Sequence, residues 1–383
     1  MYDLLVIGGG IHGVNVVEIA ASKGYKVMLL EQNTIASGTS SKSSKLIHGG
    51  LRYLETGQLS LVRECLKERL LLLKRAPDLV KLRPFFIPIF PETRRRPGMI
   101  RIGLSMYAVL GGFCKDGRFC TVSKSKWLTL DGLKQDKLSH VFLYYDAQTD
   151  DKKLTQAVVA SAQKLGADVL TNAELINASS RTNAWEITYK TEQTHIVHSK
   201  IIVNAAGPWV NQVLSRIDSD VGEVGIDWVQ GTHVIVKGEI TQGIYYIESP
   251  DDGRAVFVMP WYGNTMIGTT ETLYQGRLAE IHPLQSEIDY LLRTYSYYFP
   301  QRSVEFLDAF AGVRVLPASE SNPFQRSRDT ILKVDDENNP TLLNIYGGKL
   351  TAAHATAEAV MKKLQFVLPV PTKNIDLSEV ALS

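Results

Sequence analysis

The stretch that decides the fold is Leu4-Leu5-Val6-Ile7-Gly8-Gly9-Gly10-Ile11-His12-Gly13, close to the start of the chain. Its four apolar residues predict a buried parallel strand, and the six that follow fit the pattern G-x-G-x-x-G. Residues 14–23 continue with helical spacing up to Gly24. Tyr25 to Leu30 predicts a second strand, which ends in Glu31. This order of strand, helix and strand is the context in which the glycine pattern binds a dinucleotide.

Each glycine of the motif has a physical task. Gly8 permits a tight turn, Gly10 lets the backbone approach a pyrophosphate, and Gly13 lets helix and strand pack closely. Free N–H groups at the helix start favour a phosphate. The Glu31 carboxylate can accept hydrogen bonds from a ribose diol. A glycine-rich turn without a ligand is the alternative, and at this point NAD and FAD both fit.

Length, charge and cysteine content narrow the class of protein. The 383 residues predict two domains. A net charge of +2 argues against a dedicated nucleic-acid-binding protein, whose domain is usually clearly basic. Cys65, Cys114 and Cys120 form no C-x-x-C pair and are typical of free thiols in a reducing compartment. The eight histidines are scattered and indicate no metal site.

The N-terminus and the apolar segments bear on location. Tyr2-Asp3 leads straight into the first strand, without the basic start, longer apolar stretch and cleavage site of a secretory signal. The longest mostly apolar stretch, Ile102 to Cys114, is shorter than the ~20 residues that span a bilayer. We therefore expect a cytoplasmic protein.

Three later segments favour FAD over NAD. Ser37 to Lys45 is rich in hydroxyls, and it runs into Leu46 to Glu55, where paired glycines permit close approach to a flat ring. Ile201 to Trp209 predicts a strand that ends in small residues before a helix. Leu343 to Leu364 predicts a strand, a Gly-Gly turn and a helix whose N-terminus can face the flavin. Each segment alone has an ordinary alternative, namely a polar loop, a corner or a docking helix.

The run from Ser37 to Glu55 resembles the signature of the FAD-dependent, aerobic glycerol-3-phosphate dehydrogenases, which belong to the D-amino-acid-oxidase-type superfamily. The resemblance covers essentially the whole chain. Further marks of the family follow in order at Asp146 to Leu154, Asn204 to Val210, Gly231-Thr232-His233, Pro260-Trp261, Ile267 to Glu271, Gly312-Val313-Arg314 and Gly347 to Thr351.

The chain also departs from the family pattern. Its helix ends near Leu364, where longer members carry a further helical domain, so the resemblance implies a short form. His12 replaces the more usual asparagine. Gln230 stands where the family tends to have lysine, and Ala352-Ala353-His354 stands for Thr-Tyr-Arg. The last two changes lie near the expected pocket and leave room for a different substrate.

The resemblance implies an α/β fold, α+β overall, in which a Rossmann-like FAD-binding domain is interleaved with an antiparallel-sheet substrate domain. The FAD-binding domain is expected to comprise residues 1–75, 146–218 and 309–383, and the substrate-binding domain residues 76–145 and 219–308. The residue pattern itself predicts a helix over 151–165 capped by Asp150. It also predicts strands at residues 228–236, 244–247, 255–259 and 265–268.

Oxidation of an alcohol by a flavin needs a base and an anchor for the substrate. His233 is the candidate base, because histidine changes its protonation near neutral pH and because it lies in the family's Gly-x-His motif. Arg52 and Arg314 lie in apolar contexts and need a partner, either a structural carboxylate or a substrate phosphate. The resemblance implies catalytic roles for His233, Arg314 and Lys349, and substrate contacts for Arg52, Tyr53, Thr270, Arg314 and Lys349.

The resemblance implies that FAD is held noncovalently, although a covalent histidyl link occurs elsewhere in the superfamily and His48 lies in the flavin motif. The residues expected to bind FAD are Gly8, Gly10, Ile11, His12, Gly13, Glu31, Gln32, Thr39, Ser40, Ser41, Lys45, Leu46, His48, Gly49, Leu175, Ala205, Ala206, Gly207, Trp209, Gly312, Gly348, Lys349, Leu350 and Thr351.

The implied reaction is the oxidation of sn-glycerol 3-phosphate to dihydroxyacetone phosphate by hydride transfer to flavin N5, with the electrons passed on to a quinone. Two alternatives stay open: a related flavin oxidoreductase for another anionic hydroxy compound or an amine, and a non-catalytic FAD-binding scaffold. The oligomeric state stays open too.

A quinone acceptor implies a surface that faces the inner side of a membrane. Residues 82–104 carry five arginines, with Glu92 as the one acidic residue. Interleaved apolar side chains in this segment predict a peripheral membrane contact, and a solvated basic loop fits equally well. These side chains are Phe85, Phe86, Ile87, Ile89, Phe90, Met99 and Ile100.

Overall fold

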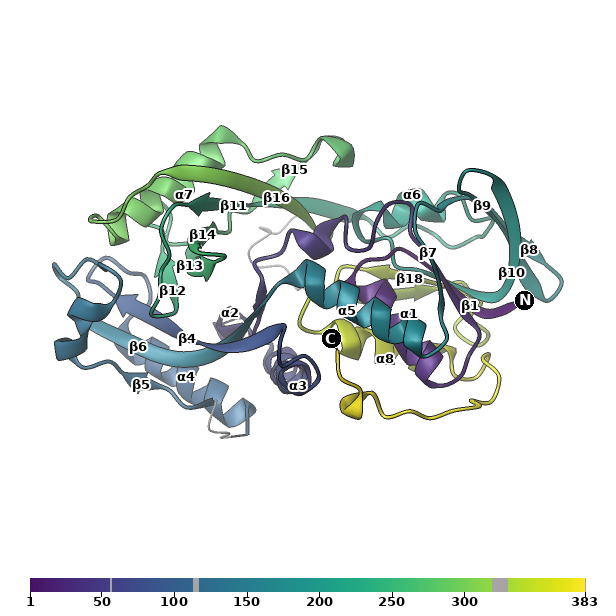
Figure 1. Cartoon of the computed structure of the whole chain (residues 1–383), viewed down its shortest axis with the longest axis horizontal. Helices are drawn as coiled ribbons and strands as arrows, with labels where there is room; N and C mark the ends of the chain where they lie inside the picture. Colours follow the sequence, from purple (N-terminus) through teal and green to yellow (C-terminus); the bar gives the residue numbers. More distant parts are fainter. Residues whose placement is uncertain (56, 113–116, 319–329, 383) are drawn as a thin grey trace.

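The structure, a computed structural model, describes residues 1–55, 57–112, 117–318 and 330–382. Two large sheets lie toward the two ends of an elongated molecule (Figure 1). The first sheet comprises β1 (Tyr2–Ile7), β2 (Val27–Leu30), β7 (Asp168–Leu170), β8 (Glu174–Arg181), β9 (Ala184–Lys190), β10 (Thr194–Asn204), β17 (Ile331–Val334) and β18 (Leu342–Tyr346). The second comprises β3 (Leu46–Ile47), β4 (Val80–Ile89), β5 (Cys120–Thr121), β6 (His140–Thr149), β11 (Ile226–Val236), β12 (Ile244–Glu248), β13 (Ala255–Trp261), β14 (Asn264–Gly268), β15 (Thr272–Tyr274) and β16 (Phe306–Pro317).

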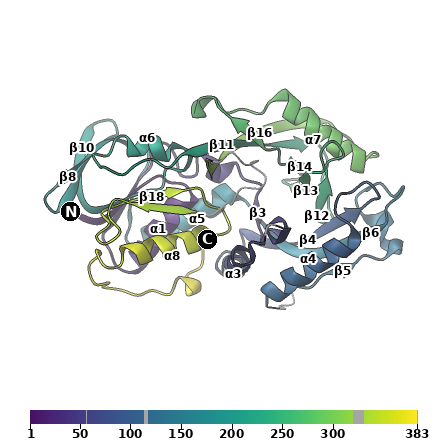
Figure 2. The ribbon, with the colours of Figure 1, turned by 180° about the vertical axis from the view of Figure 1, so that it is seen from behind.

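The helices divide between the two sheets (Figures 1 and 2). In the described residues they are α1 (Ile11–Ser22), α2 (Leu51–Glu55), α3 (Leu59–Arg75), α4 (Pro97–Leu110), α5 (Asp151–Lys164), α6 (Val210–Leu214), α7 (Gln285–Tyr298) and α8 (Ala353–Leu364). Helices α1, α5 and α8 lie with the first sheet, whereas α4 and α7 lie with the second.

The first sheet has a parallel centre in the order β18-β10-β1-β2-β7. Along β1, Leu4 and Val6 pack with α1, α5 and α8, whereas Leu5 and Ile7 pack with the β8–β9 hairpin and α6. All four side chains are buried, because both faces of a parallel sheet are covered. This arrangement confirms the predicted buried strand and the Rossmann-like half of the fold.

Most predicted elements are present with small shifts at their ends. Helix α1 begins at Ile11, earlier than predicted, and α8 begins at Ala353, slightly later. Asp150 caps α5 as predicted, since its Oδ1 accepts a hydrogen bond from the backbone N–H of Lys153 at 3.0 Å. The four strands predicted between residues 228 and 268 are β11, β12, β13 and β14.

The second sheet carries helices on both faces. Leu291 and Tyr295 of α7 pack on one face, while α3 and α4 pack on the other. Its described strand pairs are antiparallel except for β4 with β12, which runs parallel and pairs Phe85 with Ile244. The prediction of an antiparallel sheet therefore needs one correction. Strands β4 and β12 are far apart in the chain, so no hairpin fixes their relative direction.

The apolar side chains predicted to enter a membrane are mostly in the core, which corrects that prediction. Phe85 and Ile89 belong to β4, a central strand between β12 and β6, and the strand is covered on both faces. Phe86, Ile87, Phe90 and Ile100 are buried as well. Of the seven predicted side chains, Met99 on α4 is the one that is largely exposed, at 52%. Among the described residues no helix is long and apolar enough to cross a membrane.

Several segments pass between the two sheets. Leu46-Ile47, which follows the first βαβ unit, pairs with β6 of the second sheet. Strand β16 pairs with β11 along its whole length and leads toward the C-terminal strands β17 and β18. Strands β6 and β16 each cross one of the predicted domain boundaries, which stay a prediction. The cavity described next is lined by residues of both sheets.

Candidate active site

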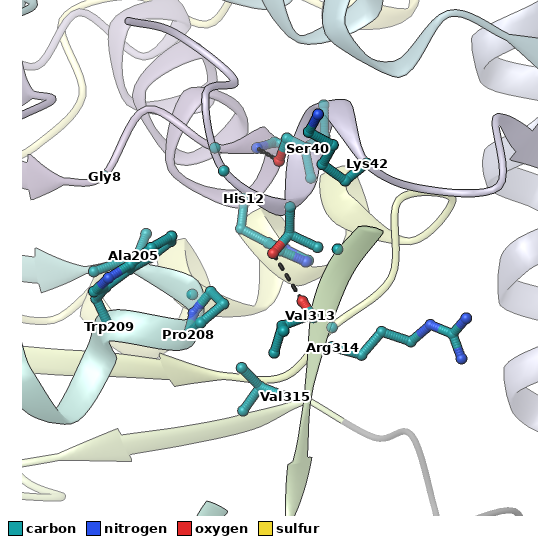
Figure 3. Close-up of a pocket in the computed structure, with 18 of the residues that line it drawn as sticks. Gly8, His12, Ser40, Lys42, Ala205, Pro208, Trp209, Val313, Arg314 and Val315 are labelled. Carbon is teal, nitrogen blue, oxygen red and sulfur yellow. Dashed lines mark hydrogen bonds between the residues drawn. The ribbon is translucent and has the colours of Figure 1, made fainter. Parts of the chain in front are cut away.

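A large cavity is lined by residues from four distant parts of the chain. Figure 3 shows Gly8, His12 and Ser40 on one side, Ala205 and Trp209 on a second, and Val313 to Val315 of β16 on a third. Most of the residues predicted to bind cofactor or substrate line this cavity. They are Gly8, Gly10, Ile11, His12, Glu31, Gln32, Thr39, Ser40, Leu46, His48, Tyr53, Leu175, Ala205, Ala206, Gly207, Trp209, His233, Gly312, Arg314, Gly348, Lys349, Leu350 and Thr351.

The cofactor half of the cavity is built largely from backbone. Gly8 has a φ of 110°, and a Cβ there would lie 2.6 Å from the carbonyl oxygen of Ala205. The Glu31 carboxylate accepts hydrogen bonds from the backbone N–H groups of Gly9 at 2.7 Å and Asn33 at 2.8 Å. These bonds hold the glycine turn against the end of β2. The turn, the start of α1 and the strand ends fit a dinucleotide whose phosphates lie at the helix N-terminus.

His12 closes one side of this half. A Cβ on Gly348 would lie 2.2 Å from its Nε2, so the start of α1 and the C-terminal Gly-Gly turn are in close contact. Burial lowers the pKa of His12 to about 4, so the imidazole is neutral at physiological pH. A neutral ring adds no charge beside the bound cofactor.

Four residues predicted to bind FAD lie outside the cavity lining, namely Gly13, Ser41, Lys45 and Gly49. Their contacts are with neighbouring parts of the protein. A Cβ on Gly13 would lie 2.0 Å from the Gly8 oxygen, so Gly13 serves helix packing. The Lys45 ammonium donates to Asp151 at 2.6 Å and to the backbone oxygen of Ser41 at 2.6 Å, which ties the hydroxyl-rich loop to α5. The backbone N–H of Gly49 donates to Tyr107 Oη at 2.7 Å. The cofactor contacts of these four stay predictions.

His233 lies at the other end of the cavity, on β11, and is 1% exposed. Its ring stacks on Phe310 with centroids 4.9 Å apart, and its Nε2 lies 3.0 Å from Ser44 Oγ. Burial, together with the positive charges of Lys45 and Arg314, holds the pKa of His233 well below its usual value. The imidazole is therefore neutral and has a lone pair available to accept a proton.

Three arginines converge on the Glu271 carboxylate beside this histidine. Arg314 donates to it at 2.6 Å, Arg254 lies at 3.3 Å and Arg52 at 3.7 Å. Arg314 lines the cavity, whereas Arg52 lies outside its lining. The sequence left two partners open for Arg52 and Arg314, a structural carboxylate and a substrate phosphate. Both arginines pair with the Glu271 carboxylate, and Arg314 also faces the cavity, where a phosphate could bind.

The remaining predicted substrate residues differ in their surroundings. The Lys349 ammonium lies 4.1 Å from the centroid of the Tyr53 ring, and both residues line the cavity. Thr270 is 3% exposed and lies outside the lining. Its hydroxyl donates to Glu287 at 2.8 Å and accepts from the backbone N–H of Thr232 at 2.9 Å. A direct contact between this hydroxyl and a substrate would require one of these bonds to change.

Several residues of the site have no assigned role in the sequence prediction. Ser44 lies in a segment that the motif marks, but nothing in the pattern indicates its contact with His233. Glu271 ends a family mark, and its role as the shared partner of three arginines depends on chain segments more than 200 residues apart. Arg216 lines the cavity near Leu175 and is tied to Glu174 at 2.7 Å.

A glycine-lined half joined to a half with a buried histidine and cationic side chains fits an enzyme that uses a dinucleotide cofactor. Residues 3–362 match the family described as FAD dependent oxidoreductase (DAO). The chain therefore belongs to this family and is an FAD-dependent oxidoreductase, and the predicted cofactor and family are confirmed.

Its relatives narrow the resemblance. The chain is 38% identical to the glycerol-3-phosphate dehydrogenase of Pseudomonas aeruginosa over 95% of this chain and 72% of the relative. It is 35% identical to the D-erythritol 1-phosphate dehydrogenase of Brucella abortus over 96% of this chain and 74% of the relative. The crystal structure of the glycerol-3-phosphate dehydrogenase from Bacillus halodurans complexed with FAD covers 97% of this chain with a TM-score of 0.75 and 27% identity, matching 67% of that chain.

Proposed function

We propose that this chain oxidises sn-glycerol 3-phosphate to dihydroxyacetone phosphate and passes the electrons to a quinone. The observation that carries the proposal is the cavity itself, in which the glycine-lined half is continuous with His233, Arg314 and Lys349. Relatives at 35–38% identity bear the names of polyol phosphate dehydrogenases. When bound, FAD supplies the acceptor for the hydride that leaves the substrate carbon.

His233 is the proposed base for the substrate hydroxyl. Its neutral imidazole can take the hydroxyl proton as the carbon loses its hydride, so proton and hydride leave the substrate separately. The low pKa of His233 comes first from burial and then from Lys45 and Arg314. A phosphate dianion beside Arg314 offsets that positive charge, which makes the imidazole a better proton acceptor only when substrate is bound.

Arg314 and Lys349 are the proposed anchors for the phosphate, because both face the cavity. A guanidinium binds a phosphate through two parallel hydrogen bonds, and an ammonium binds it as a point charge. Arg52 belongs to the same cluster through Glu271 and is proposed to act at its edge. Tyr53 lies against Lys349 and limits the space around the ammonium.

The test is anaerobic bleaching of the flavin band at about 450 nm by a panel of donors. We expect fast bleaching by sn-glycerol 3-phosphate and none by glycerol or 2-hydroxyglutarate. Bleaching by a different donor alone would refute the proposed substrate, and bleaching by none of them would favour a non-catalytic FAD-binding protein.

Arg314→Gln separates substrate binding from cofactor binding. It removes one charged, bidentate contact, so we expect the half-saturating concentration of substrate to rise by about a hundredfold while FAD content is unchanged. Arg277→Gln is the matched control, because the Arg277 side chain is 81% exposed and does not line the cavity. Unchanged half-saturation in Arg314→Gln would show that the phosphate is held elsewhere.

A longer polyol phosphate is the second candidate substrate. The match to a D-erythritol 1-phosphate dehydrogenase supports it. Gln230 and His354, which stand where the family pattern has lysine and arginine, lie outside the cavity lining, so the expectation that these changes lie at the pocket is wrong and they lend the candidate no support. D-erythritol 1-phosphate therefore belongs in the same donor panel, and the ratio of bleaching rate constants for the two phosphates decides between them.

Delivery of electrons to a quinone calls for contact with a membrane, and we propose α4 as the contact. Met99, Ile102, Met106 and Val109 are 37–65% exposed and recur at helical spacing along one face. Arg101 is exposed on the same helix. Such a face suits the headgroup region of an anionic bilayer at the cytoplasmic side. Co-sedimentation with anionic vesicles tests this contact, and Ile102→Glu is expected to abolish co-sedimentation. Equal co-sedimentation of wild type and Ile102→Glu would exclude α4 as the contact.

A further inference from the structure

One buried carboxylate lies behind the substrate half of the cavity. Glu287, in the first turn of α7, is 6% exposed. Its Oε2 accepts hydrogen bonds from Thr232 Oγ1 at 2.6 Å, Gln230 Nε2 at 2.8 Å and the backbone N–H of Leu284 at 3.3 Å. Its Oε1 accepts from Thr270 Oγ1 at 2.8 Å and Thr272 Oγ1 at 2.9 Å. One side chain therefore joins two separate chain segments, residues 230–232 and 270–272.

The alternation of side chains along a strand gives these bonds a meaning. Successive side chains of a strand point to opposite faces. On β11 the side chains of Gln230 and Thr232 face Glu287, so Gly231 and His233 face the other way, and both line the cavity.

The same alternation holds in the second segment. The side chains of Thr270 and Thr272 face Glu287, and the residue between them, Glu271, points to the arginines. Thr269 Oγ1, also on that side, accepts from Arg314 at 3.3 Å. Glu287 thus binds the back of both segments whose fronts carry the histidine and the partner of Arg314.

We propose that Glu287 is a positioning residue, which holds His233 and the Glu271–Arg314 pair in register with each other across the substrate half of the cavity. The inference rests on the proposed function for its catalytic meaning, and it assigns a role to a residue that touches neither substrate nor cofactor.

The carboxylate suits this task because it is ionised and saturated with donors. Burial by itself raises the pKa of Glu287, but its hydrogen bonds from Thr232, Thr270, Gln230 and Thr272 outweigh that effect and hold the pKa below its usual value. An ionised carboxylate accepts at both oxygens, whereas an amide accepts at only one of its two terminal atoms. Gln at this position therefore keeps the shape and loses part of the bonding.

The test compares three proteins loaded with FAD: wild type, Glu287→Gln and Glu287→Ala. We expect the limiting rate constant of bleaching by sn-glycerol 3-phosphate to fall by about tenfold in Glu287→Gln and about a hundredfold in Glu287→Ala, because small misplacements of reacting groups are costly. FAD content and reduction by dithionite should not change. Asp289→Asn is the matched control, since it removes an exposed carboxylate from the same helix.

A second measurement does not depend on turnover. Titration calorimetry with inorganic phosphate reports the anion-binding side of the cavity, and we expect the Kd to rise at least about tenfold in Glu287→Ala and to stay unchanged in Asp289→Asn.

The combined outcomes separate the two claims. If wild type bleaches and both Glu287 variants match it within about twofold in rate and Kd, the positioning role is refuted even where the melting temperature falls. If wild type is not bleached but Glu287→Ala weakens phosphate binding, the proposed function fails and the positioning of the anion site stands. If wild type is not bleached and Glu287→Ala binds phosphate as wild type does, both the proposed function and the positioning role are refuted.

Discussion

The two halves of the cavity are built by different means. In the cofactor half, close approach of backbone to backbone sets the shape: a Cβ on Gly8 or Gly13 would lie within 3.0 Å of a carbonyl oxygen. In the substrate half, the shape depends on side chains held by other side chains, such as Arg314 by Glu271 and Thr232 by Glu287. Substitutions in the cofactor half should therefore have large effects on folding and FAD binding, whereas substitutions in the substrate half should weaken function in smaller steps.

Gly13→Ala is expected to give the largest effect and to test the first half of the comparison. The new Cβ would lie 2.0 Å from the Gly8 oxygen, so either α1 or the glycine turn must move. We expect a loss of about 3 kcal/mol in unfolding free energy, or failure to fold, together with loss of FAD. Urea unfolding and the flavin content of the purified protein measure both.

Gly103→Ala is the control for this change. Gly103 lies within α4, and a Cβ there meets nothing within 4 Å among the described residues. The substitution should be neutral or stabilise the protein by up to ~1 kcal/mol, since alanine favours helix. A Gly13→Ala protein as stable and as yellow as Gly103→Ala would show that the glycine turn adapts, and the contrast between the halves would be wrong.

Glu271→Gln tests the second half, with a smaller expected effect. The carboxylate is bound by Arg314 at 2.6 Å, with Arg254 and Arg52 within 4 Å. A neutral amide holds the guanidiniums less firmly, so we expect about tenfold weaker substrate binding, or ~1.4 kcal/mol, with FAD content unchanged. Half-saturation of anaerobic bleaching measures it. Tighter binding would instead show that Glu271 competes with the substrate for Arg314.

The same difference explains which parts of the site the sequence predicts. The positions of Gly8, Gly10 and Gly13 could be predicted because a backbone approach that excludes a Cβ leaves glycine as the residue that fits. The strand, helix and strand around them follow from apolar spacing along a short stretch of chain. One local motif is therefore enough to predict most of the cofactor half.

The contacts of the substrate half are hard to predict from the sequence, because they join segments that are distant in the chain. Nothing near Glu287 marks it as the partner of Thr232, which lies 55 residues earlier. The prediction that the apolar side chains of residues 85–90 face a membrane was wrong for a related reason: an apolar run with basic residues is typical both of an interfacial segment and of a central strand such as β4. Only the neighbouring strands β12 and β6 decide between them.

The smallest expected effect comes from a largely buried histidine–carboxylate pair, His354 and Glu68, between α8 and α3. His354 Nδ1 lies 3.5 Å from Glu68 Oε1, and the two side chains are 13% and 9% exposed. Burial by itself lowers the pKa of His354, but Glu68 on α3 and Glu358 on α8 outweigh that effect and Arg75, so the pKa is raised above its usual value. The pair joins α3 to α8, and α8 follows the Gly347-Gly348 turn that lines the cavity.

The sign of the pH dependence follows from that direction. A histidine whose pKa is higher in the folded protein stabilises it fully below the unfolded value of about 6.5, and the contribution is lost as the pH rises through the folded pKa. His354→Gln should therefore lose up to ~1 kcal/mol of unfolding free energy at pH 6 and almost none at pH 9. Urea unfolding at the two pH values measures this difference.

His198→Gln provides the control, because His198 lies 3.5 Å from Glu186 in a pair whose side chains are 49% and 31% exposed. At the same distance, solvent screens this pair and its removal should leave stability unchanged at both pH values. Equal losses for the two variants, or a loss for His354→Gln that does not depend on pH, would mean that the buried pair adds nothing electrostatic. One side-chain contribution to the cofactor half would then be removed from the comparison, and its contrast with the substrate half would be sharper.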